Sequence, residues 1–201
     1  MSRIVVTNHV TLDGVMQAPG RPDEDRRGGF AHGGWAQPAN DAVMGKVMGE
    51  GIAQAGALLF GRRTYEDFAS IWPNESEDNP YASVINGFQK YVASRTLEAP
   101  LSWSNSTLLK GDAVEAVARL REQPGKDIVV LGSGELIQQL MRHNLIDAYV
   151  LLIHALVLGS GRRLFPDGSS FAALKLVDTK TTTTGVVIAT YQPAEAAART
   201  T

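Results

Sequence analysis

Three short stretches have the composition of phosphate-binding turns: Gly61-Arg62-Arg63-Thr64, Ser94-Arg95-Thr96 and Gly132-Ser133-Gly134-Glu135-Leu136. Each follows an apolar segment that is typical of a buried strand. Glycine lets the backbone turn where a side chain would clash, and a helix that begins there presents N–H groups and a positive dipole end to an anion. The arginines add charge-assisted hydrogen bonds. The spacing also allows ordinary strand-to-helix turns with solvated arginines.

The positions of these turns indicate a dinucleotide. Ligands of open α/β sheets bind at the carboxyl ends of the strands, so two glycine turns that lead into helices can hold a pyrophosphate. The basic turn between them can hold one more phosphate. The usual Gly-x-Gly-x-x-Gly fingerprint is absent, however. The alternative is that Gly132 and Gly134 serve only the close packing of a helix on a strand.

One carboxylate and two tryptophans are further candidates. Asp13 lies in a predicted turn, where it could bind or polarise a substrate, although Asp-Gly is also a common turn pair. Trp35 and Trp72 could line a substrate pocket or belong to the core, and Phe30 with Trp35 could form a lid. The histidines lack metal-ligand spacing and there is no cysteine, so we expect no bound metal.

The segments that must position these residues alternate between strands and helices. The spacing of apolar residues and the positions of turn-forming residues predict strands at 3–10, 57–60, 90–93, 106–109, 127–131, 148–156, 174–184 and 185–191. They predict helices at 41–55, 62–72, 81–88, 112–121 and 135–143, with Asp112 as an N-cap. Alternation followed by a closing hairpin predicts a mixed α/β sheet with antiparallel edge strands.

Length, charge and composition narrow the classes of protein. The 201 residues fit one domain, which we place at 1–192, and the Ala-rich tail 193–201 is expected to be disordered. A formal net charge of −2 gives no general attraction to nucleic acid or to an acidic membrane. We find neither a bilayer-length apolar run nor a signal peptide, and we therefore expect a cytoplasmic protein.

Several motifs follow one another in order along the chain. They are Thr11–Gly14, Gly61–Glu66 followed by Trp72, Val130–Leu136, and the C-terminal pieces 145–147, 154–159 and 163–165. This ordered set resembles the dihydrofolate reductase-like superfamily, and within it the riboflavin-biosynthesis reductase branch, the reductase half of deaminase–reductase proteins. The resemblance covers roughly residues 2–192. Ala155 stands where relatives often have proline.

The resemblance implies a three-layer α/β/α fold with a central mixed, mostly parallel sheet and an antiparallel C-terminal hairpin. It implies an NADPH site in which Arg62, Arg63 and Thr64 bind phosphates, Ser94 and Arg95 lie at the 2′-phosphate, and the turn 132–136 holds the pyrophosphate.

The implied activity is reduction of a small heterocyclic or sugar-phosphate substrate, similar to the 5-amino-6-(5-phosphoribosylamino)uracil reductase. Asp41 and Glu50 are the only acids on the helix that carries the pterin-binding acid of dihydrofolate reductases, and neither sits in a motif, so we assign no pterin chemistry. The alternative is a non-catalytic nucleotide- or flavin-binding module of the same fold.

We also expect a homodimer built on the C-terminal strands. The segment 149–158 is apolar on both faces. One face can pack on the chain's own helices, and the other requires a cover that a two-fold pairing would supply. On this prediction Leu152→Arg separates the pair. The alternative is that the hairpin 174–191 covers both faces.

Overall fold

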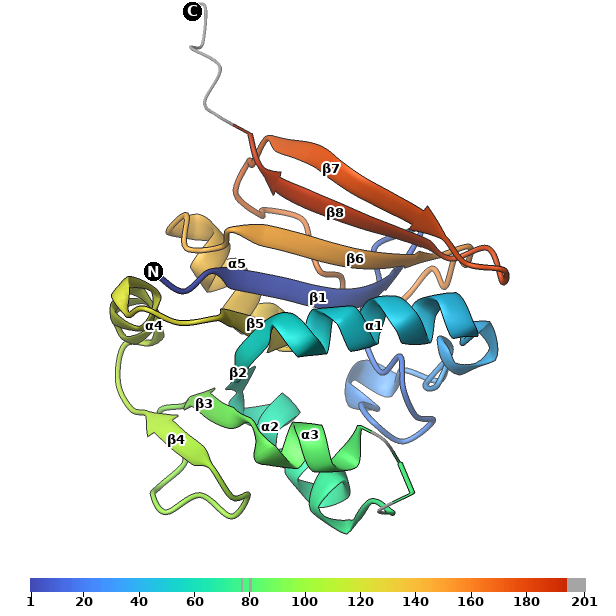
Figure 1. Cartoon of the computed structure of the whole chain (residues 1–201). Coiled ribbons are helices and arrows are strands. Elements are labelled where there is room, and N and C mark those ends of the chain that lie inside the picture. The colour runs from blue at the N-terminus through green and yellow to red at the C-terminus, as the bar shows by residue number, and fades with distance from the viewer. Residues whose placement is uncertain (77, 80, 195–201) are drawn as a thin grey trace, which may run out of the picture. The chain divides into compact units, whose positions relative to one another are not determined.

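A computed structural model gives the fold of the chain and describes residues 1–76, 78–79 and 81–194 (Figure 1). All of the predicted strands and helices are present, and their ends differ from the predictions by at most a few residues. The strands are β1 (Ile4–Thr11), β2 (Ala55–Gly61), β3 (Gln89–Ala93), β4 (Ser106–Leu109), β5 (Asp127–Leu131), β6 (Ala148–His154), β7 (Leu174–Thr181) and β8 (Val187–Pro193). The α-helices are α1 (Ala42–Gln54), α2 (Arg62–Ile71), α3 (Ala82–Gly87), α4 (Ala113–Glu122) and α5 (Gly134–Arg142).

The chain folds into two compact units, each made of two separate segments. The first unit combines Met1–Ile4 with Gln54–Leu145, and the second combines Val5–Ala53 with the residues from Ile146 onward. No helix in the described part of the chain is both long and apolar enough to cross a membrane.

The first unit contains four parallel strands. β4, β3, β2 and β5 are neighbours in that order. β2 is the apolar run that the sequence predicts to be covered on both faces, and Leu59 and Phe60 are fully buried. In the pairing register Gly61 lies opposite Ala93, and Leu59 lies opposite Val130. The carboxyl ends of β3, β2 and β5 therefore lie at one edge of the sheet.

The second unit supplies the mixed part of the strand arrangement. β1 and β6 are parallel, whereas β8 is antiparallel to both β6 and β7. The predicted antiparallel C-terminal hairpin is therefore confirmed. β7 ends at Thr181, earlier than predicted, because Thr182 begins a turn in which its hydroxyl accepts a hydrogen bond from the Val186 N–H. Gly185 supplies the positive φ of 86° that this turn requires.

The prediction that β6 leaves one apolar face without cover is wrong. β6 lies between β1 and β8, and Tyr149 and Leu151 on one face and Leu152 on the other are buried within the chain. Leu152 is 0% exposed and packs with Met44 of α1 and with Ile188. Leu152→Arg would therefore disrupt the core, and it cannot serve as a test of dimerisation.

The predicted C-terminal tail falls mostly outside the described residues. β8 continues through Pro193, which pairs with Leu174. Residues 195–201 are not among those that the structure describes.

Candidate nucleotide-binding site

The three predicted turns meet at one edge of the first unit. Gly61 is the last residue of β2, Ser94 follows β3, and Gly132 follows β5. Because these strands are parallel neighbours, their carboxyl ends bring the turns together. The candidate cofactor residues of the sequence thus lie at one edge of the first unit.

The two glycine turns are locked to each other by hydrogen bonds. The Gly61 N–H donates to Ser133 Oγ at 2.9 Å, and the Ser133 N–H donates to Thr64 Oγ1 at 3.1 Å. Gly132 has a φ of 55°, and a Cβ added there would lie 3.0 Å from Thr64 Cγ2. Gly132 is therefore required both by its backbone conformation and by the approach of Thr64. Ser133 also has a left-handed φ of 56°.

Two helices begin at this edge without a capping side chain. α2 starts after Gly61 and α5 after Ser133, and neither N-cap residue makes a side-chain capping hydrogen bond. By contrast, Asp112 caps α4, as predicted, and accepts hydrogen bonds from the Val114 and Glu115 N–H groups at 2.8 and 3.1 Å. The first-turn N–H groups of a helix need partners, so the N-termini of α2 and α5 suit an anion.

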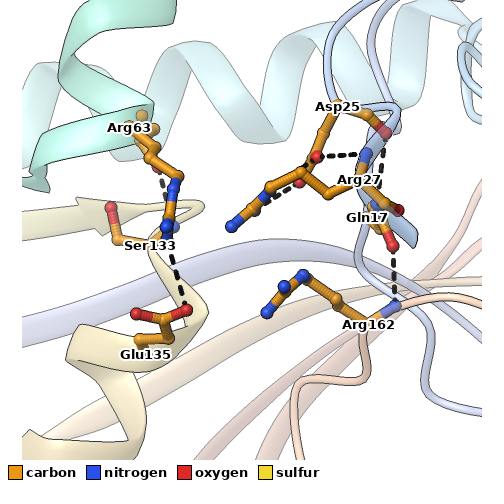
Figure 2. A network of polar contacts seen from close by, with 8 residues as sticks. Gln17, Asp25, Arg27, Arg63, Ser133, Glu135 and Arg162 are labelled. Atoms are coloured by element: carbon orange, nitrogen blue, oxygen red, sulfur yellow. Dashed lines mark hydrogen bonds and ion pairs between the residues drawn. The ribbon is translucent and has the colours of Figure 1, made fainter. Parts of the chain in front are cut away.

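The arginines of the first turn are held by surface ion pairs. Arg62 contacts Glu66 at 3.0 Å, and Arg63 contacts Glu135 at 3.3 Å, as Figure 2 shows for the second pair. All four side chains are substantially exposed. Exposed pairs of this kind contribute little energy, so a phosphate can redirect either guanidinium group at small cost. Leu136 is buried, so its side chain is part of the core.

The basic turn after β3 is shaped by its own serine. Ser94 Oγ accepts hydrogen bonds from the Thr96 and Leu97 N–H groups at 3.1 and 3.0 Å, which leaves Arg95 exposed at the tip. Arg95 lies close enough to Asp112 to contribute to the lowered pKa of that carboxyl, although the hydrogen bonds from the helix N-terminus are the larger cause. An exposed arginine on a fixed turn suits a phosphate on the periphery of the site.

The Asp13 carboxylate holds a loop of the second unit. It accepts hydrogen bonds from the Thr11 hydroxyl at 2.6 Å, the Leu158 N–H at 3.2 Å and the Gly159 N–H at 2.8 Å. The bond from Thr11 is the largest cause that lowers the pKa of Asp13 to about 2. Its contribution to stability is present above the ordinary pKa and is lost as the pH falls through about 2. This geometry favours a positioning role, and a catalytic role for Asp13 stays a prediction.

The two candidate tryptophans lie in different surroundings. Trp35 is 8% exposed, packs in a cluster with Phe30 and Val15, and donates its indole N–H to the Gln17 carbonyl at 2.7 Å. These contacts favour a core role for Trp35 and Phe30 over a lid. Trp72 is only partly buried, at the edge of the first unit's core, where it packs against Phe68. A pocket-wall role for Trp72 stays a prediction.

Sequence reasoning missed a pair of buried histidines. His9 Nδ1 lies 2.9 Å from His154 Nε2, and Trp35 stands edge-on to the His154 ring. Burial, with a smaller contribution from the charge of His154, lowers the pKa of His9 to about 4, and burial also lowers the pKa of His154. The two residues are 145 positions apart, and only the parallel pairing of β1 with β6 brings them together.

Solved structures define the class of fold. The chain aligns with a putative riboflavin biosynthesis protein from Shewanella sp. PV-4 at a TM-score of 0.71 and 22% identity, covering 96% of this chain and 99% of that one. It aligns with Enterococcus faecalis dihydrofolate reductase complexed with NADP(H) and RAB-propyl at a TM-score of 0.61 and 12% identity, covering 96% of this chain and 97% of that one. The alignment with Acinetobacter baumannii RibD has a TM-score of 0.62 and 16% identity, and it covers 97% of this chain and 59% of that one. The chain has the dihydrofolate reductase-like fold.

Within that fold the sequence also identifies the family. Residues 2–188 match the RibD C-terminal domain, and the chain belongs to this family. It is 31% identical over 196 residues to the uncharacterized protein YyaP of Bacillus subtilis (strain 168), with 94% of each chain covered. The predicted resemblance is therefore confirmed, and the named structural neighbours include reductases.

Proposed function

We propose that this protein is an NADPH-dependent reductase of a small heterocyclic or sugar-phosphate substrate. The observation that carries the proposal is the meeting of three phosphate-type turns at the carboxyl ends of β3, β2 and β5. Membership of the RibD C-terminal family supports reduction, and the dihydrofolate reductase structure with NADP(H) is a precedent for the cofactor in this fold. The proposed reaction resembles that of the 5-amino-6-(5-phosphoribosylamino)uracil reductase.

The described residues fit the cofactor. The N-termini of α2 and α5 would offer backbone N–H groups to a pyrophosphate, and Arg62 and Arg63 can turn from their glutamates toward it. Arg95 would bind the 2′-phosphate. When bound, NADPH supplies the hydride, and the protein's task is to hold and orient it against the substrate.

An assay of NADPH oxidation distinguishes a reductase from a non-catalytic binding module. Purified protein is mixed with NADPH and with candidate substrates that include the phosphoribosylamino-uracil compound, and the loss of NADPH absorbance is followed. Substrate-dependent oxidation supports a reductase. NADPH binding without oxidation across the panel supports the non-catalytic module, and a yellow protein as purified supports a flavin in place of NADPH.

Arg95→Ala is expected to weaken NADPH binding by roughly tenfold to a hundredfold and to leave NADH binding unchanged, because only NADPH carries the 2′-phosphate that a charged hydrogen bond would recognise. Titration of each cofactor by calorimetry measures the effect. Arg119→Ala, which removes another exposed arginine, on α4, is the matched control and should change neither affinity. Equal affinities of the unaltered protein for NADPH and NADH would contradict the assignment.

We retain the homodimer as a proposal and place its interface on β7 instead of β6. β7 is the last strand in the order, and it is exposed along nearly its whole length. Leu176 and Val177 on β7, together with Phe171 just before it, are large exposed apolar residues. Large exposed apolar side chains on an outer strand suit an interface with a second copy of the chain.

Val177→Arg is expected to convert the dimer to a monomer in light scattering at micromolar concentration, because a guanidinium group would be buried in an apolar interface. Val84→Arg is the matched control: Val84 is 42% exposed, against 44% for Val177, but lies on α3 in the first unit. The unaltered protein should have twice the 21.6 kDa mass of one chain. A single-chain mass for the unaltered protein would exclude this interface.

A further inference from the structure

A buried glutamine organises the long loop of the second unit. Gln17 is 4% exposed, and its side-chain N–H groups donate to the carbonyls of Asp25 at 3.1 Å and Arg27 at 3.0 Å. Its Oε1 accepts a hydrogen bond from the Arg162 N–H at 2.9 Å. One amide therefore fixes the backbone at Arg27 and at Arg162, which are far apart in the sequence (Figure 2). Buried polar side chains are nearly always hydrogen-bonded, and here the hydrogen bonds of Gln17 fix the backbone of the loop.

The Arg27 side chain is fixed by a bidentate ion pair. Asp25 accepts hydrogen bonds from Arg27 Nε at 2.8 Å and from Arg27 Nη2. Burial raises the pKa of the Asp25 carboxyl, but the hydrogen bonds and charge of Arg27 outweigh it, so the pKa is lowered and Asp25 stays ionised. Because the guanidinium group is planar, a fork that binds through Nε and Nη2 directs Nη1 away from Asp25.

The backbone at Arg162 is fixed on both sides, although its side chain is exposed. Its carbonyl accepts a hydrogen bond from the Met16 N–H at 2.9 Å, in addition to the bond from its own N–H to Gln17. The preceding residue, Gly161, has a φ of 115°, and a Cβ there would lie 2.7 Å from the Phe30 ring. The loop is thus packed against the aromatic cluster, and this holds an exposed arginine in a defined place.

From this geometry we infer that Arg27 and Arg162 form a binding pair for a phosphoryl group. Figure 2 shows both side chains extending from Gln17 in the same direction. A carboxylate is satisfied by a single guanidinium fork, as Asp25 is by Arg27, whereas a phosphoryl group has three oxygens that two guanidinium groups can share. With Asp25 ionised, the three side chains carry a net positive charge that complements such an anion.

The phosphoryl group can come from two sources, the substrate or the cofactor. The place of this pair in a reductase rests on the proposed function, whereas the binding of phosphate itself does not. Inorganic phosphate is therefore the first probe, because it tests the pair with no assumption about the reaction. NADPH titration then distinguishes the sources.

The test compares Arg162→Gln with Arg26→Gln, which makes the same charge change at a neighbouring exposed arginine of the long loop. Inorganic phosphate is titrated against the full chain at constant ionic strength, and thermal unfolding reports binding. We expect Arg162→Gln to weaken phosphate binding by about tenfold or more, as loss of a charged hydrogen bond does, and Arg26→Gln to leave it unchanged. Equal phosphate responses in the two variants, or no response in the unaltered protein, would overturn the inference.

The same variants separate the two sources. If the substrate supplies the phosphoryl group, Arg162→Gln binds NADPH normally and only its affinity for inorganic phosphate falls. If the cofactor supplies it, NADPH affinity falls in parallel with the phosphate response. Either result supports the pair. Failure of the proposed reductase would appear separately, as unaltered protein that binds phosphate but does not oxidise NADPH.

Discussion

Gly132→Val is expected to abolish NADPH binding while the protein remains folded. The native φ of 55° is one that a branched residue avoids, and strain of this kind costs roughly 1–3 kcal/mol. The added Cβ would also press on Thr64, whose hydroxyl accepts the Ser133 N–H, so the two interlocked turns would separate. Calorimetric titration with NADPH measures the loss, and circular dichroism confirms that the fold is retained.

A control at Gly111 isolates the effect of the site from backbone strain. Gly111 also has a positive φ, 97°, and lies in the same unit, but an added Cβ there meets no atom within 4 Å. Gly111→Val should therefore lose a similar amount of stability and keep its affinity for NADPH. Gly134→Val, at the first residue of α5, should likewise lose the cofactor. If either Gly132→Val or Gly134→Val folds and binds NADPH normally, the turn after β5 does not hold the pyrophosphate.

Lys90→Met is expected to lower the free energy of unfolding by roughly 2–4 kcal/mol. Lys90 is fully buried, and its Nζ donates to the carbonyls of Asn86, Phe88 and Ser104 at 2.9, 2.7 and 3.1 Å. The ammonium group also lies 4.4 Å from the centre of the Trp103 ring. Methionine matches the length of lysine but leaves the three carbonyls without this donor, and unpaired buried acceptors are costly.

Urea unfolding with Lys110→Met as a control measures this loss. Lys110 pairs with Glu98 at 2.8 Å on the surface, where the change should cost less than about 0.5 kcal/mol. Burial lowers the pKa of Lys90 to about 8, so the measurement belongs at neutral pH, where the ammonium form prevails. Equal stabilities for the two variants would show that water replaces the lysine at no cost.

Local patterns were sufficient to predict the elements and the turns. The strands at 106–109 and 127–131 have the predicted bounds, and Asp112 caps its helix as predicted. These features depend on the spacing of apolar side chains, on glycine and on helix capping, all of which act over a few neighbouring residues. The three candidate turns could be identified for the same reason, since each lies between an apolar strand and a polar segment.

The partners of these residues depend on the pairing of distant strands. The positions of Arg62 and Arg63 were predictable, but their ion pairs with Glu66 and Glu135 were not. β6 looks like a strand in need of cover when it is read alone, yet Met44 of α1 packs on Leu152 at one face and Phe165 contacts Tyr149 at the other.

The buried polar groups were the least predictable feature. The hydrogen bond from Arg162 to Gln17 spans 145 positions, and so does the contact between His9 and His154. Amino-acid type indicates what chemistry a side chain can perform. Its burial and its hydrogen-bond partner follow from strand order and register, which bring together residues that no local pattern relates.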